Sequence, residues 1–217
     1  MNILILGAAG SVGRRAVMEA LQRGHQVTAT GRNLSRLQVL PDDVAVCALD
    51  MADSAALAEL AREQDVVINA TRPANGEEQS ITRNTLGLMQ GLANSPARLL
   101  VVGGAASLTV PNSGGRLLLD DPDFLSPSLR HIGQASLDQY AVCLDENQVD
   151  WTYLCPPAEL LPGERTGTYR VGRDELLLDE HGRSHISMED LVVALLDEIE
   201  QPQFRRQFRQ QRFTVAY

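Results

Sequence analysis

The feature that most constrains the fold is a glycine pattern near the start of the chain. Three glycines spaced three residues apart follow the apolar run at residues 2–6: Gly7, Gly10 and Gly13. An amphipathic pattern that begins at Ser11 and Val12 comes next, and strand, glycine turn and helix in this order form the phosphate-binding turn of dinucleotide-binding domains. The glycines permit a tight bend, let a pyrophosphate approach the backbone and let the helix pack on the sheet. The N–H groups and dipole at the helix start then favour the negative phosphates.

The first hundred residues continue as alternating apolar runs and helical patterns. Strands are expected at 2–6, 26–30, 44–49, 65–70 and 98–102, and helices at 11–23, 54–62 and 77–93. This alternation is typical of β-α-β units, and right-handed crossovers between parallel strands lead to the Rossmann fold. The sequence therefore predicts an α/β protein with a doubly wound parallel sheet.

The second half is less regular, but it contains no linker that would divide the chain. Residues 103–127 are rich in Gly, Pro, Ser and Asp, and Pro-Pro and Pro-Gly pairs interrupt residues 156–187. Long irregular segments are usually functional, so both are predicted to be substrate-side loops. Further helices are expected at 128–147 and 188–200, and strands at 151–155, 168–171, 176–179 and 213–216. We therefore predict one domain over residues 1–217 with a small C-terminal substrate lobe.

The end of the second expected strand indicates which dinucleotide is bound. An NAD-binding domain places an acidic side chain there to bind the ribose 2′-hydroxyl, but no Asp or Glu occurs between Glu19 and Asp42. Arg32 stands at this place, and its guanidinium suits a 2′-phosphate, which accepts two parallel hydrogen bonds. Arg14, in the first turn of the helix, adds a second positive charge. The sequence therefore predicts NADP(H) in preference to NAD(H).

Two further strand ends are predicted to line the cofactor, because ligands of such sheets bind at the carboxyl ends of the strands. Asp50 and Met51 follow the third strand, where they would border the adenine. Ala70 and Thr71 follow the fourth strand, where backbone groups would line the second ribose.

Composition limits the partners and the compartment. The formal charge is −9, whereas nucleic acid and anionic membranes need a basic face, so neither partner is expected. No apolar run approaches the roughly 20 residues that span a bilayer, and no signal peptide is expected. Three well-separated cysteines indicate a reducing compartment, so the expected location is cytoplasmic. No metal site is predicted, and the arginine-rich residues 204–213 are expected to form a solvated surface segment.

Motifs along nearly the whole chain carry a family resemblance: ILGAAGSVGRR, VTATGRN, DMAD, VVGGAAS, WTYLCPP, GERTGTYRVG and HISMEDLVVALLDEIEQP. They resemble the short-chain dehydrogenase/reductase superfamily, specifically its atypical branch of NAD(P)H-binding, NmrA-like and biliverdin reductase B-like proteins. The resemblance implies a Rossmann fold and an NAD(P)H-dependent oxidoreductase, or a regulator that binds the dinucleotide without turnover.

The chain departs from that superfamily at the catalytic pair. Typical members use Tyr-x-x-x-Lys, in which the lysine lowers the tyrosine pKa so that the tyrosine can donate a proton. Tyr140 lies in the expected helix 128–147, but Leu144 takes the lysine position, and all 19 basic residues of the chain are arginine. Tyr140 is therefore either a site-lining residue or an ordinary helix-face aromatic. Ser107, at the end of VVGGAAS, is the candidate serine that orients the substrate.

Acceptors that spread the developing negative charge depend less on a proton donor, and the hydride chemistry belongs to the nicotinamide. The expected function is therefore an NADPH-dependent reductase of a small conjugated acceptor such as a quinone or flavin, acting as a monomer or homodimer. A non-catalytic NADP(H)-binding redox sensor of the NmrA-like type is the alternative. His131, at the start of a helix, is a further residue that could face the pocket, and Glu164 and Arg165 are predicted to form a surface or loop-closing ion pair.

Overall fold

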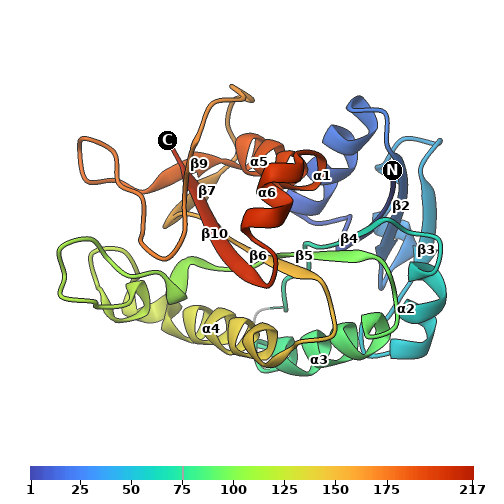
Figure 1. Cartoon of the computed structure of the whole chain (residues 1–217), viewed down its shortest axis with the longest axis horizontal. Helices are drawn as coiled ribbons and strands as arrows, with labels where there is room; N and C mark the ends of the chain where they lie inside the picture. The colour runs from blue at the N-terminus through green and yellow to red at the C-terminus, as the bar shows by residue number, and fades with distance from the viewer. Residues whose placement is uncertain (75) are drawn as a thin grey trace.

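Eight strands form one sheet in the order β3-β2-β1-β4-β5-β6-β10-β8 (Figure 1). The structure is a computed structural model that describes residues 1–74 and 76–217. The strands of this sheet are β1 (Asn2–Leu6), β2 (Gln26–Gly31), β3 (Ala45–Ala48), β4 (Val66–Asn69), β5 (Arg98–Val102), β6 (Trp151–Cys155), β8 (Arg170–Gly172) and β10 (Gln211–Ala216). The helices are α1 (Ser11–Gln22), α2 (Ser54–Ala61), α3 (Ser80–Leu92), α4 (Arg130–Asp145), α5 (Met188–Glu200) and α6 (Pro202–Gln207). The predicted doubly wound sheet is confirmed.

The central strands are parallel, and the helices that connect them bury them on both faces. β1, β4, β5 and β6 are predominantly apolar, and nearly every residue in them is buried. Leu4 of β1 pairs in register with Thr28 of β2 on one side and Val67 of β4 on the other. The chain order therefore reverses between β1 and β4, and a doubly wound sheet binds its ligands at the carboxyl ends of strands at such a switch point.

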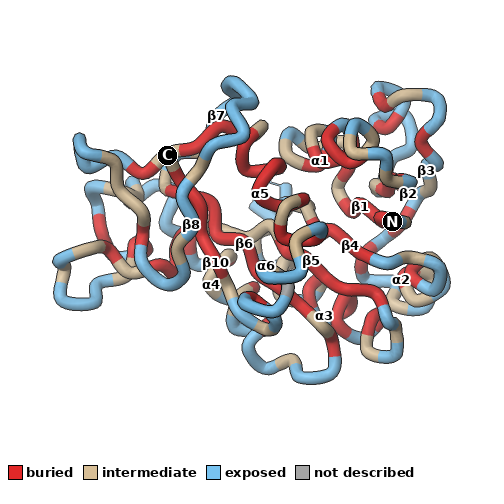
Figure 2. Tube along the Cα trace, turned by 45° about the horizontal axis from the view of Figure 1, so that its top comes forward, coloured by how far each residue is buried: buried red, intermediate tan, exposed pale blue. Residues whose placement is uncertain are grey.

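Two helical layers cover the sheet (Figures 1 and 2). α1 and α5 pack on one face, over an apolar cluster that includes Ile3 and Ile5. α2, α3 and α4 pack on the other face, over a cluster that includes Leu4 and Leu6. Successive residues of β1 thus enter opposite layers, as the two-residue period of a strand requires.

The second half departs from the predicted elements in the lobe. A separate parallel sheet of β7 (Glu159–Leu161) and β9 (His185–Ser187) has no predicted counterpart, because strands of three residues carry almost no periodic signal. The strand expected at 168–171 is β8, which pairs antiparallel with β10. The strand expected at 176–179 is wrong: this stretch is irregular, and only the neighbouring Glu175 forms an isolated bridge, with Thr109.

The arginine-rich residues 204–213 are not a wholly solvated segment, so that expectation is also wrong. They include the end of α6, and Phe208 is buried with its ring stacked on Phe213 at 4.9 Å between centroids. The guanidinium of Arg173 lies 5.6 Å from the centre of the Phe208 ring. The aromatic residues between the arginines anchor the segment to the core.

Candidate dinucleotide site

The glycine turn occupies the switch point between β1 and β4. Gly7 has a left-handed backbone (φ 79°), which favours glycine. A Cβ on Gly7 would lie 2.8 Å from the carbonyl oxygen of Ala70, and a Cβ on Gly13 would lie 2.2 Å from the carbonyl oxygen of Gly7. A Cβ on Gly10 would lie 3.1 Å from the same oxygen. The turn therefore packs directly on the segment that follows β4, with no room for side chains.

Backbone hydrogen bonds fix the turn and leave donors at the helix start. The carbonyl oxygen of Thr30 accepts from the N–H groups of Gly7 (3.2 Å) and Ala8 (3.1 Å). Gly10 is the N-cap of α1 and has no side chain to accept from the first turn. The N–H groups of Ser11 and Val12 have no partner within the helix, and with the helix dipole they form a position for an anion.

The end of β4 lies against the glycine turn, and the two together form the switch-point crevice that a doubly wound sheet is expected to have. Asn69 Oδ1 accepts hydrogen bonds from the N–H (3.1 Å) and the hydroxyl (2.7 Å) of Thr71, and the Ala70 N–H donates to Leu6 O at 3.0 Å. The Asn69 side chain is buried, and its Nδ2 has no hydrogen-bond partner among the described residues. An unsatisfied buried amide beside a bare glycine cradle is typical of a site that a polar ligand completes. The residues present therefore fit a dinucleotide.

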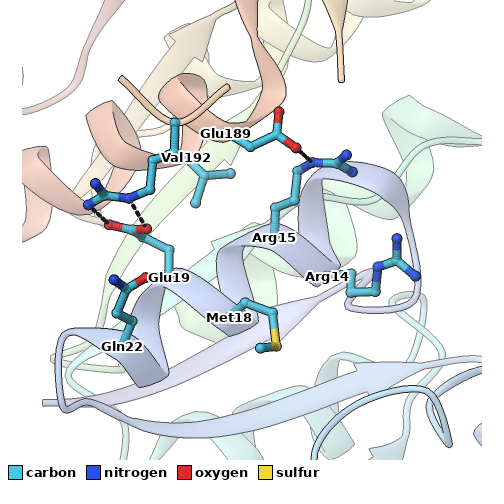
Figure 3. A pocket seen from close by; sticks show the side chains of 8 residues that line it. Arg14, Arg15, Met18, Glu19, Gln22, Glu189 and Val192 are labelled. Carbon is cyan, nitrogen blue, oxygen red and sulfur yellow. Dashed lines mark hydrogen bonds and ion pairs between the residues drawn. The ribbon is translucent and has the colours of Figure 1, made fainter. Parts of the chain in front are cut away.

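Two arginines lie near the glycine turn, one after β2 and one at the start of α1. Arg32 follows β2, and its Nη1 lies 4.0 Å from Glu77 Oε2, with 71% of the Arg32 side chain exposed. An exposed pair at this distance contributes little, so the guanidinium stays available to a ligand. Arg14 lies at the glycine-turn end of α1, and Figure 3 shows it directed away from the ion pairs of that helix.

The residues after β3 are held by the backbone around them. Asp50 is exposed, and its Oδ1 accepts from the N–H of Ala52 at 3.0 Å. Met51 is buried, and its carbonyl oxygen lies 2.7 Å from the place of a Cβ on Gly87 of α3. The structure thus brings the predicted cofactor residues together at the carboxyl ends of β1 to β4, and their contact with a dinucleotide stays a prediction.

A strap at residues 162–169 crosses the outside of α1 and α5. Glu189 of α5 accepts from Arg15 Nε of α1 (2.6 Å) and from the N–H of Gly163 in the strap (2.8 Å). Arg165 binds both carboxylate oxygens of Glu19 in α1, each at 2.8 Å. These residues surround a shallow pocket of about 190 Å³, which Figure 3 shows. Arg165 thus pairs with Glu19 of α1 and not with Glu164, so the ion pair expected between Glu164 and Arg165 is wrong.

Arg23 joins α1 to α5 at the far end of the same seam. Its guanidinium binds Glu19 at 2.8 Å, Asp197 at 2.8 Å and Glu200 at 2.7 Å. Burial opposes the charge of Arg23, but the hydrogen bonds to the three carboxylates outweigh it and raise the pKa of the guanidinium. The seam between α1 and α5 is thus held by charge as well as by apolar packing.

Asp190, in the first turn of α5, binds the strap through hydrogen bonds. Its side chain is fully buried; Oδ1 accepts from the N–H of Gly167 (2.8 Å), and Oδ2 accepts from the hydroxyls of Thr166 (2.6 Å) and Tyr217 (2.7 Å). Burial opposes its charge, but these hydrogen bonds outweigh that effect and lower the pKa of the carboxyl. No role is predicted for Glu189 or Asp190 from the sequence. Both lie in the HISMED motif, and an acidic pair at the start of an expected helix is the signal that could have pointed to them.

Tyr140 is packed among aromatic rings. Its ring centre lies 5.0 Å from that of Tyr153 and 6.5 Å from that of Trp151, with the Arg212 guanidinium 5.0 Å away. Burial raises the pKa of the Tyr140 phenol, which disfavours ionisation near neutral pH. The role of Tyr140 in catalysis stays a prediction.

Ser107 is also buried, beside the same group. Its Oγ lies 4.0 Å from Cys155 Sγ, and its carbonyl oxygen accepts from Arg212 at 2.7 Å. Arg212 therefore links the two predicted catalytic residues, Ser107 and Tyr140, on the α4 side of the sheet. The role of Ser107 likewise stays a prediction.

Fold and crevice together define a Rossmann-type dinucleotide-binding protein. A family profile described as NAD(P)H-binding matches residues 7–202. The chain belongs to this NAD(P)H-binding family, which confirms the predicted kinship with atypical short-chain dehydrogenases/reductases. It is thus an NAD(P)-binding oxidoreductase-type protein.

Relatives cover the whole chain. YwnB of Bacillus subtilis (strain 168), an uncharacterized protein, is 36% identical over 221 residues, which span 100% of this chain and 98% of YwnB. A solved structure from Burkholderia pseudomallei, provisionally described as an exported protein, is 36% identical with a TM-score of 0.86 and full coverage of both chains. SP1627 of Streptococcus pneumoniae TIGR4, provisionally assigned as an NADH-flavin reductase, is 26% identical with a TM-score of 0.86, covering 100% of this chain and 99% of its own.

No helix in the described part of the chain is long and apolar enough to cross a membrane. The cytoplasmic location stays a prediction, because one relative carries the description of an exported protein.

Proposed function

We propose that this protein is an NADPH-dependent reductase that transfers a hydride to a small conjugated acceptor, such as a quinone or a flavin. The observation that carries the proposal is the combination of three features at the switch point. These are the glycine turn, the N-terminus of α1, and Arg32 at the end of β2. The flavin reductase assignment of SP1627 supports the acceptor class.

Different residues of the crevice bind different parts of the dinucleotide. Gly7, Gly10 and the first turn of α1 hold the pyrophosphate, and Arg32 with Arg14 holds the 2′-phosphate. When bound, the dinucleotide supplies a hydride to an acceptor that lies beside it. Residues 103–127 and 156–187 form the acceptor-side walls, and the chain acts as a cytoplasmic monomer or homodimer.

The cofactor preference is tested by reversing the charge at β2. Arg32→Asp should weaken NADPH binding tenfold or more while NADH binding changes little, because a charge-assisted pair is lost. Fluorescence titration of both cofactors measures this. Arg62→Asp is the matched control, since Arg62 is an exposed arginine that pairs with Glu59 on α2. An Arg32→Asp protein that keeps the parent preference for NADPH would contradict the assignment.

A redox sensor is the second candidate function. The packing of Tyr140 among aromatic rings and the absence of lysine favour it. A sensor binds NADP(H) but oxidises none of it with a panel of quinones, flavins and aldehydes. Turnover of any panel member decides for the reductase, and binding without turnover decides for the sensor.

A further inference from the structure

We infer that His131, which lies beside Glu78, is the proton donor to the reduced acceptor; this inference rests on the proposed reductase function. His131 Nε2 lies 3.7 Å from Glu78 Oε1, and 57% of the His131 side chain is exposed. The Glu78 carboxylate is itself fixed, because its Oε1 accepts from the N–H of Gly76 at 2.9 Å. The pair places an imidazole, the side chain that most often serves as a general acid, next to a carboxylate.

The direction of α4 places His131 beyond the carboxyl end of the sheet. Ser136 of α4 lies beside Gly104, which follows β5, and its carbonyl oxygen accepts from the hydroxyl of Tyr153. Tyr140, one turn later, packs against Trp151 at the beginning of β6. The helix therefore runs opposite to β6, and its first turn, with His131, projects past the strand ends where the acceptor binds.

Glu78 connects this position to the dinucleotide crevice. Its neighbour Glu77 faces Arg32 at 4.0 Å, at the end of β2. The short segment before α3 thus reaches from the proposed 2′-phosphate position to His131. The hydrogen bond from Gly76 lowers the pKa of the Glu78 carboxyl, and the charges of His131 and Arg72 add to this effect. The partner of His131 is therefore anionic under the conditions of the reaction.

The other histidines pair with carboxylates in other parts of the molecule. His25 precedes β2 at the opposite edge and binds Glu200 at 2.7 Å. His181 and His185 lie in the lobe beside Glu180 and Asp179. Because the chain has no lysine and Tyr140 is packed under Arg212, His131 is the group suited to donate a proton at the crevice.

Reduction of a quinone to a hydroquinone takes one hydride and one proton. A bound NADPH would supply the acceptor with a hydride and its electron pair, and would be oxidised to NADP⁺. One quinone oxygen is left as a phenolate, and the imidazolium of His131 transfers its proton to that oxygen. The products are the hydroquinone and neutral imidazole, which regains a proton from water.

The experiment compares His131→Gln with His25→Gln, using menadione as the acceptor. His131→Gln should lower kcat tenfold or more, because positioned proton donors contribute at least that much, while KM and the Kd for NADPH stay within twofold. His25→Gln removes a histidine of the same His–carboxylate type from the far edge and should keep the parent kcat. Unchanged NADPH binding shows that each variant is folded.

The pH profile separates proton donation from a structural role. The parent kcat should fall as pH rises, because proton donation needs the protonated donor, and His131→Gln should lack this fall. The charged groups that face His131 are Glu78 and, beyond it, Arg72; Arg130, its neighbour on α4, is bound to Asp120. Glu78→Gln removes the carboxylate beside the imidazole, so kcat should fall.

Three results would overturn the inference. A His131→Gln protein with the parent kcat and pH profile removes His131 from the reaction and leaves the reductase function intact. A Glu78→Gln profile identical to the parent removes Glu78 from the proposed pair. A parent protein that binds NADPH but turns over no acceptor overturns the reductase function itself, and the proton-donor role falls with it.

Discussion

The glycine turn and the strap at residues 162–169 both pack against α1, but they are held by different forces. The turn is held by contacts within the backbone: Gly7, Gly13 and Ala70 lie so close that a single added carbon would collide. The strap is held by side-chain charges from distant parts of the chain, such as Arg165 on Glu19. Added volume should therefore damage the turn, whereas removed charge should damage the strap.

The largest effect is expected from volume in the turn. Gly13→Ala places a Cβ 2.2 Å from the Gly7 oxygen, and such overpacking costs about 1–3 kcal/mol of stability. It should also weaken NADPH binding more than tenfold, because the cradle must open. Urea unfolding and cofactor titration measure the two effects. Gly31→Ala is the control, since its nearest neighbour there, Leu37, is at an ordinary 3.7 Å; equal losses in both variants would refute the steric account.

A comparable loss of stability, without loss of cofactor binding, is expected from the strap anchor. Asp190→Ala leaves the N–H of Gly167 and the hydroxyls of Thr166 and Tyr217 without their acceptor. Leaving buried donors without their acceptor should lower the free energy of unfolding by about 2–3 kcal/mol. NADPH binding should change less than threefold. Asp138→Ala, at an exposed position of α4, should stay within about 0.5 kcal/mol of the parent.

Acid should weaken the strap through the same carboxyl. The pKa of Asp190 is lower in the folded protein than its ordinary value of 3.8. Its stabilising effect is therefore complete above that ordinary value and is lost as pH falls through the lowered pKa. Asp190→Asn should show a shallower loss of stability below pH 3.8 than the parent. Unfolding by urea at several acid pH values measures the slope, and parallel curves for the two proteins would show that Asp190 does not titrate in this window.

The smallest effect is expected for the ion pair of the strap with α1. A double-mutant cycle with Glu19→Gln and Arg165→Gln should give a coupling of about 0.5–1 kcal/mol, because Arg165 is partly exposed and salt screens the pair. The coupling should decrease in about 0.5 M salt, because dissolved ions screen the attraction between the two side chains strongly at that concentration. A coupling that is independent of salt would indicate that packing, and not charge, joins the strap to α1.

The contrast between the glycine turn and the strap also explains which features could be predicted from the sequence. The turn depends on neighbouring residues, so its glycines, the start of α1 and the position of Arg32 are visible as local patterns. Asp190, Glu189 and Arg15 act through partners far along the chain, and β7 and β9 are too short for a periodic signal. Tyr140 shows the limit well: the sequence places it on the correct helix, but only the tertiary packing places Trp151, Tyr153 and Arg212 around its ring.

The three carboxylates around Arg23 give the α1–α5 seam a particular kind of sensitivity. A guanidinium stays a cation at every pH at which a protein folds, so mild changes in acidity cannot discharge the centre of this cluster. Dissolved ions compete with such pairs, most effectively at the solvent-exposed Glu200. Concentrated salt, and not moderate acid, is therefore the solvent condition that should loosen the helix carrying the phosphate-binding turn.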